Sequence, residues 1–180
     1  MPPVLSEFAE RALIGIADAD STAEPEYAIL RVSSIVEVYV DELLEELSSR
    51  HLSDTTTFER AVADLVGTQL RQSWSERRKW LNTFGVALSG QSVSQDFDLV
   101  VDLRNAIAHG GGRITHLQRK SLPKQLSLLA DFERKLGAHT DGDQVTCSEA
   151  TVQKAIKIVS QYVRALDDVA GRRQASVVAR

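Results

Sequence analysis

The run from Leu103 to Arg113, LRNAIAHGGGR, combines residue types that can do chemistry at short range. Arg104 and Asn105 precede His109 closely, and glycines follow it directly. Arginine keeps its positive charge at physiological pH, whereas histidine gains and loses a proton near neutrality. A fixed cation and a titratable base are what RNA cleavage without a metal ion requires. This run is therefore the first candidate for a functional site.

The apolar spacing predicts that the run closes a helix from Asp96 to His109. The predicted core stripe of this helix consists of Leu99, Val100, Leu103, Ala106 and Ile107. With Asp98 at zero and about 100° per residue, Arg104 falls at roughly 240° and His109 at roughly 20°. The two residues then flank a narrow strip of small or modest side chains, made of Val101, Asn105 and Ala108. Such a strip lets another helix approach closely, so we expect Arg104 and His109 to line a helix–helix seam.

Two interpretations of this helix end stay open. Asp98 and Asp102 share its polar side with His109, so a carboxylate can orient the imidazole from a turn or more away. Alternatively, Arg104 and His109 only favour the helix dipole at a C-terminus. The glycines then serve as a C-cap followed by a flexible loop.

The elements that position this run read as helices almost throughout. Helices are predicted at 4–20, 26–50, 58–70, 74–86, 96–109, 123–136 and 148–170. The second of these is apolar over more than half its circumference, which predicts a central position. A loop is expected at 89–94 and a polar turn at 139–144, with no convincing strand. The predicted fold class is an all-α helical bundle of about five to six helices with a long central helix.

Composition limits the class of protein. The 180 residues suffice for one domain, expected at 1–170 and followed by a disordered tail at 171–180. The formal charge of −4 argues against a protein that coats nucleic acid by bulk electrostatics, but a local basic groove stays possible. The single cysteine, Cys147, favours a reducing cytoplasm and is expected to be a small packed residue. No membrane span, signal peptide or metal site is expected.

The motif and its surroundings resemble the HEPN superfamily, small helical bundles with an Arg-x4-6-His motif. The wording LRNAIAHGGGRIT is similar to the RiboL-PSP-like branch. The long helix ILRVSSIVEVYVDELL and the late segment QYVRALDDVAG also resemble the family, so the resemblance covers Pro25 to Gly171.

The resemblance implies a metal-independent endoribonuclease of a toxin–antitoxin or anti-phage type. It assigns the motif positions to Arg104, Asn105 and His109, with no cofactor. It also implies a homodimer in which two motifs face each other, and a cognate antitoxin or inhibitor protein as a further partner. RNA would be cleaved by attack of its 2′-hydroxyl. The alternative is a non-catalytic HEPN-like module that binds RNA, a nucleotide or a protein partner, because the family includes such members.

Further polar residues carry two interpretations each. Glu37 and Ser33 share a face of the central helix and are either supporting residues of the site, as is Asp102, or part of a solvated edge. Arg77, Arg78 and Lys79 lie between Trp74 and Trp80; they either guide RNA, or form a solvated face with both indoles in the core. The residues after the motif form the densest positive stretch and either contact the RNA backbone or form a plain basic face. They are Arg113, His116, Arg119, Lys120 and Lys124.

Overall fold

The computed structural model describes residues 5–19, 24–51, 56–57, 64, 67–68, 73–119 and 121–178. In this part of the chain the α-helices are α1 (Glu7–Asp18), α2 (Pro25–His51), α4 (Trp74–Thr83), α5 (Ser92–Gly110), α6 (Leu122–Asp131) and α7 (Glu149–Val178). A π-helical turn, η2 (Phe132–Leu136), follows α6, and strands β1 (His139–Asp141) and β2 (Gln144–Thr146) pair as an antiparallel hairpin. The all-α bundle is confirmed.

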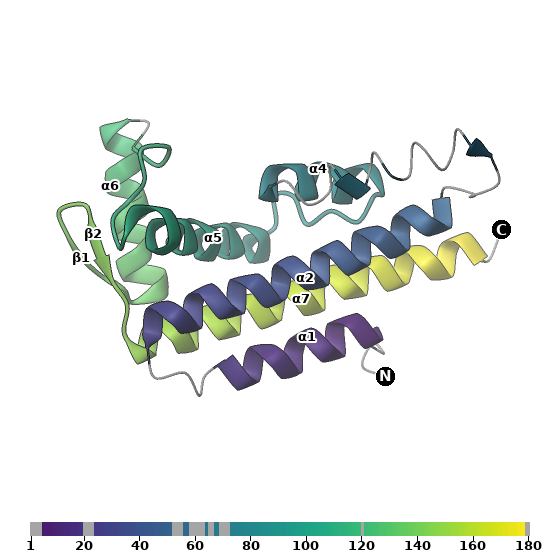
Figure 1. Cartoon of the computed structure of the whole chain (residues 1–180), viewed down its shortest axis with the longest axis horizontal. Helices are drawn as coiled ribbons and strands as arrows, with labels where there is room; N and C mark the ends of the chain where they lie inside the picture. The colour runs from purple at the N-terminus through teal and green to yellow at the C-terminus, as the bar shows by residue number, and fades with distance from the viewer. Residues whose placement is uncertain are drawn as a thin grey trace.

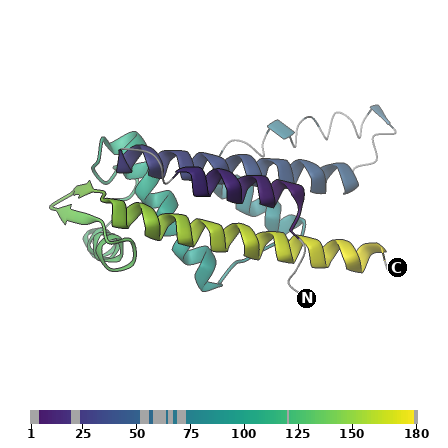
Figure 2. The same ribbon diagram turned by 90° about the horizontal axis from the view of Figure 1, so that it is seen from below.

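Two long helices form the axis of the bundle. α2 and α7 run side by side in the same direction, while α1 and α5 run the opposite way along them (Figure 1). α1 covers one side of this pair and α5 the other, as the view from below also shows (Figure 2). α4 packs on α2 beside α5, whereas α6 and the hairpin close one end. The motif helix α5 therefore lies against the central pair, with its C-terminus near the hairpin.

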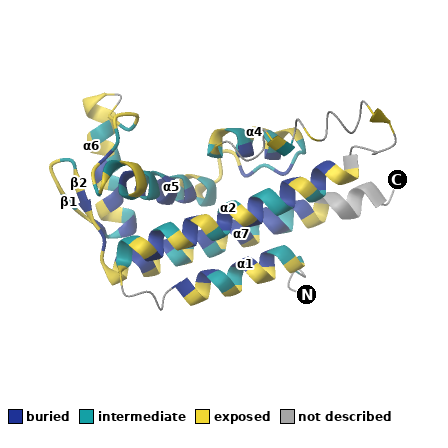
Figure 3. Ribbon diagram, in the orientation of Figure 1, coloured by how far each residue is buried: buried dark blue, intermediate teal, exposed yellow. Residues whose placement is uncertain are grey.

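The core follows the central pair and the inner face of α5 (Figure 3). The central position predicted for 26–50 is confirmed, because α2 buries apolar residues along its whole described length. Phe97 of α5 lies flat on Tyr162 of α7, with ring centroids 3.9 Å apart. Trp74 of α4 packs on Phe97 in a T-shaped arrangement, with ring centroids 4.9 Å apart. The predicted core stripe is also confirmed: Leu99, Val100, Leu103 and Ala106 are buried and Ile107 packs against them.

Helix ends show how local sequence fixes the arrangement. Ser6 caps α1 by accepting a hydrogen bond from the Ala9 amide, and it also donates from its own amide and hydroxyl to Asp167 of α7. Ser148 caps α7 as predicted, through reciprocal hydrogen bonds with Thr151. The Ser6–Asp167 contact joins the start of α1 to α7, and these two segments are far apart in sequence.

Several boundaries differ from the prediction. α5 begins at Ser92, inside the predicted loop, and α7 continues through Gly171 to Val178, where a disordered tail is predicted. Glycine inside a helix costs only about 1 kcal/mol, and Arg172 pairs with Asp168 one turn earlier at 2.6 Å. The predicted polar turn is a hairpin whose Gly142 has a φ of 59°. Most of the predicted helix at 58–70 lies outside the described residues.

Cys147 is a packed residue, as predicted. It is buried, its amide donates to Glu26, and burial together with the Glu26 charge raises the pKa of its thiol to about 12. Because the thiolate is the reactive form, we expect the native protein to react with iodoacetamide at least about 100-fold more slowly than the unfolded chain at mildly alkaline pH. Comparable alkylation rates, followed by mass spectrometry, would contradict this burial.

Candidate active site

The glycine run ends the motif helix and fixes its last turn. Gly111 is the C-cap of α5 in the left-handed conformation, with a φ of 59°, as predicted for a glycine stop. The Gly112 amide donates to the Ala106 carbonyl at 3.1 Å, and the Gly112 carbonyl accepts from the Val145 amide of β2 at 2.7 Å. The turn is thus hydrogen-bonded to the hairpin. The exposed side chain of His109 therefore lies at a helix end that is fixed by hydrogen bonds to α5 itself and to the hairpin.

Neighbouring glycines give a matched test of this turn. Alanine at Gly111 meets nothing within 4 Å, so its cost comes only from the left-handed backbone, and we expect a loss of about 1–2 kcal/mol of unfolding free energy. Gly110→Ala keeps a helical backbone and meets Thr115 at an ordinary 3.7 Å, so its effect stays within about 1 kcal/mol. Chemical denaturation measures both. Equal costs for the two variants would argue against the left-handed cap.

Arg104 and His109 meet within one chain. Arg104 Nη1 is 3.0 Å from His109 Nε2 and 3.2 Å from the Oδ1 of Asn105. A guanidinium only donates hydrogen bonds, so Nε2 of His109 accepts, which requires a neutral imidazole with its proton on Nδ1. The three motif residues predicted from sequence are therefore brought together.

This contact differs from the separation of Arg104 and His109 that the helix angles predict. The helix angles separate the two residues, but the long arginine side chain reaches along the last turns to the imidazole. Val101 of the predicted strip is buried in the chain's own core, while Asn105 is half-buried and Ala108 is exposed. The strip is therefore not a continuous free surface. What remains accessible is the end of α5, where Ala108 and His109 lie.

Glu37 of α2 lies on the other side of Arg104. Its Oε1 is 3.9 Å from Arg104 Nη2, an ion pair, and it accepts a hydrogen bond from Trp74 Nε1 at 3.1 Å. Both partners of the ion pair are partly shielded, with side chains 25% and 23% exposed. The predicted proximity of Glu37 to the motif is thus present. Ser33, one turn earlier, is buried, and its hydroxyl has no hydrogen-bond partner among the described residues.

The carboxylates of α5 bind other neighbours. Asp102 accepts from Gln118 Nε2 through its carbonyl at 2.8 Å and its side chain at 3.2 Å, which holds the loop after the motif. Asp98 pairs with Arg78 of α4. Burial raises the pKa of Asp98, the Arg78 charge opposes this, and the Asp102 charge adds to it. Both carboxylates therefore help to hold α5 against its neighbours. The His109 ring contacts Arg104 instead.

The basic stretch after the motif is partly neutralised. Arg113 and Arg119 both pair with Asp143 at the hairpin turn, the first at 2.7 Å. Arg119 also donates to the Ile114 carbonyl at 3.0 Å. His116 is exposed, and Lys120 lies outside the described residues. The two arginines therefore hold the loop and hairpin together, and their contact with RNA stays a prediction.

The tryptophan segment contains the contacts that sequence reasoning missed. Arg77 is buried, so a solvated face is wrong for this residue. It binds both carboxylate oxygens of Asp41 at 2.8 and 2.9 Å, and its guanidinium lies 5.4 Å from the Trp74 ring. Burial acts to lower the pKa of Arg77, but the hydrogen bonds and charge of Asp41 raise it overall. The available signal was that Asp41 follows Glu37 by one helical turn.

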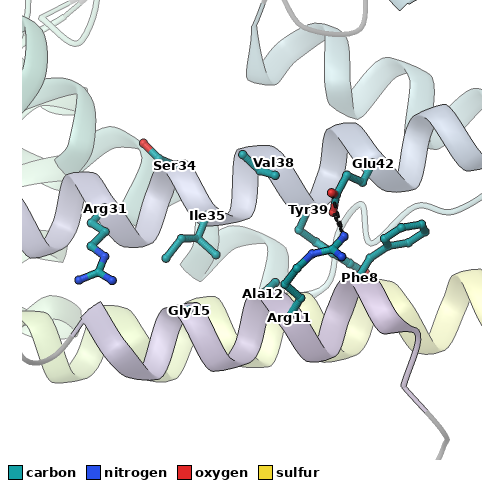
Figure 4. Close-up of a pocket in the computed structure, with 10 residues that line it drawn as sticks. All are labelled: Phe8, Arg11, Ala12, Gly15, Arg31, Ser34, Ile35, Val38, Tyr39 and Glu42. Carbon is teal, nitrogen blue, oxygen red and sulfur yellow. Dashed lines mark hydrogen bonds and ion pairs between the residues drawn. The ribbon is translucent and has the colours of Figure 1, made fainter.

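The apolar groove between α1 and α2 is a separate feature. Figure 4 shows Phe8, Ala12 and Ile35 along it, with the Arg11–Glu42 ion pair at one end. At about 100° per residue, Ile35 lies on the opposite side of α2 from Glu37 and Asp41. The groove contains no residue of the motif and is not part of the candidate active site.

No family model, curated protein or solved structure matches the chain. In the part that the structure describes, there is no group of three or more His, Cys, Asp or Glu side chains able to hold a metal ion. Over the same residues, no helix is long and apolar enough to cross a membrane.

Proposed function

We propose that the protein is a metal-independent endoribonuclease of the HEPN type, similar to its RiboL-PSP-like branch, with Arg104 and His109 as catalytic residues. The observation that carries the proposal is the 3.0 Å contact between the guanidinium and the imidazole at the exposed end of α5. A general base and a phosphate-binding cation lie there in direct reach of each other, and of solvent.

The chemistry follows from the donors and acceptors. A phosphate that enters draws the Arg104 guanidinium away from His109, because charged oxygens are stronger acceptors than a neutral imidazole. Nε2 of His109 is then free to take the proton of the ribose 2′-hydroxyl, whose oxygen attacks the adjacent phosphorus. The guanidinium stabilises the negative charge that builds on the phosphate oxygens. The 5′-oxygen leaves, and the products carry a 2′,3′-cyclic phosphate and a 5′-hydroxyl.

The leaving oxygen needs a proton, and a second copy of the chain supplies an acid. In a homodimer with two α5 ends facing each other, the imidazolium of one His109 protonates the leaving group while the other acts as base. The exposure of Ala108 and His109 supports this arrangement. The biological setting we propose is cytoplasmic, in toxin–antitoxin or anti-phage defence, with a separate antitoxin or inhibitor protein controlling the site.

The test compares RNA and DNA strands of the same sequence, with EDTA present. We expect the RNA to be cut and the DNA to stay intact, because DNA lacks the attacking 2′-hydroxyl. Cleavage of both strands, intact RNA across sequences and conditions, or cleavage that EDTA abolishes would each overturn the proposal.

A further inference from the structure

The α4 helix grips α2 through two carboxylates that lie one turn apart. Trp74 donates its indole N–H to Glu37 at 3.1 Å, and Arg77 binds Asp41 through two hydrogen bonds. The Arg77 guanidinium also lies over the Trp74 ring, and that ring packs on Phe97 of α5 in a T-shaped arrangement with centroids 4.9 Å apart. Trp74 is therefore fixed from three directions, by α2, by its own helix and by α5.

Glu37 transmits this fixed position to the motif. Its Oε1 accepts the indole N–H and also faces Arg104 Nη2 at 3.9 Å. The other terminal nitrogen of the same guanidinium, Nη1, contacts His109 and Asn105. With Nη2 drawn toward Glu37, the planar guanidinium has Nη1 turned toward the imidazole. Without Glu37 and its indole donor, the long arginine side chain regains rotamers that do not reach His109.

We propose that Trp74 is a positioning residue of the active site and acts through Glu37 to set the orientation of Arg104 toward His109. The inference rests on the proposed function, because a positioned guanidinium matters for catalysis only if Arg104 and His109 cleave RNA. It assigns α4 a role beyond packing. The Arg77–Asp41 pair, whose side chains are 8% and 20% exposed, supports this role by holding the indole at its place on α2.

The chain offers a matched control on the same helix. Trp74→Phe keeps an aromatic ring against Phe97 but removes the indole donor. Trp80→Phe makes the same chemical change six residues later on α4. Nε1 of Trp80 is buried and finds no hydrogen-bond acceptor in the described part of the chain. Glu37→Gln is the second variant, because its amide oxygen still accepts from Trp74 while the charge facing Arg104 is lost.

Cleavage kinetics give the first readout. We expect Trp74→Phe and Glu37→Gln each to lower kcat by about tenfold with little change in KM, because a misplaced guanidinium affects the transition state more than RNA binding. Trp80→Phe is expected to retain the wild-type kcat. A Trp74→Phe protein whose kcat equals that of Trp80→Phe, at equal melting temperature, overturns the inference.

A second readout separates this inference from the proposed function. The ¹⁵N chemical shifts of the His109 ring distinguish an Nε2 that accepts a hydrogen bond from one without a donor. We expect these shifts to change in Trp74→Phe and Glu37→Gln but not in Trp80→Phe. A change without RNA cleavage by the wild type would defeat the proposed function and leave the positioning intact. Unchanged shifts in Trp74→Phe would defeat the positioning by Trp74.

Discussion

Replacing His109 by alanine is expected to lower the rate of RNA cleavage in EDTA by about 10²–10⁴-fold. The reason is that the variant loses the group that accepts the 2′-hydroxyl proton and, in a dimer, also the group that protonates the leaving oxygen. The side chain is exposed at the end of α5, so its removal leaves the core intact. Initial rates on a fluorescent RNA strand measure the effect.

His139→Ala is the control for this variant. His139 is also exposed, and it begins β1 on the hairpin. We expect this protein to cleave at the wild-type rate. Wild type, His109→Ala and His139→Ala are purified in the same way. A contaminating nuclease would then give equal activity in all three preparations. A His109→Ala protein as active as the wild type would remove His109 from the mechanism.

The largest effect on stability is expected for Phe97→Ala, at about 3–5 kcal/mol of unfolding free energy. Phe97 is 1% exposed and packs on both Tyr162 of α7 and Trp74 of α4. Truncation removes the stacked pair and the edge contact, and it opens a cavity where α4, α5 and α7 meet. Urea unfolding, followed by circular dichroism, measures the loss.

Gln95→Ala serves as the comparison on the same helix. Gln95 is exposed, so its replacement is expected to change the unfolding free energy by no more than about 0.5 kcal/mol. A loss below about 1 kcal/mol for Phe97→Ala would mean that the three helices do not meet at this ring. Trp74, which we propose positions Arg104, packs on Phe97. The same measurement therefore tests how firmly Trp74 is anchored.

Local patterns predicted the motif helix well. The apolar spacing of α5 identified its buried stripe because helical periodicity is written directly into the sequence. Gly111 revealed the end of the helix, since few residues other than glycine adopt a left-handed C-cap readily. These features depend on neighbouring residues alone, and a single sequence contains all of them.

Contacts between distant segments were beyond the same patterns. The helix angles separated Arg104 from His109, because such angles describe Cβ directions and ignore the reach of a long side chain. The sequence indicated a solvated Arg77, because nothing in the α4 sequence shows that Asp41 of α2 binds it. The hydrogen bond from Trp74 to Glu37 was not predicted, because Glu37 lies on another helix. The hairpin was missed because its three-residue strands are too short to show an alternating pattern.

The chemical identity of the RNA ends tests the central claim most directly. Mass spectrometry of the fragments, formed in EDTA by the wild-type protein and absent with His109→Ala, reads the mechanism from its products. Attack by the 2′-hydroxyl, with Arg104 on the phosphate and His109 as base, predicts 2′,3′-cyclic phosphate and 5′-hydroxyl ends. Fragments with 3′-hydroxyl and 5′-phosphate ends would contradict it, since they require attack by water.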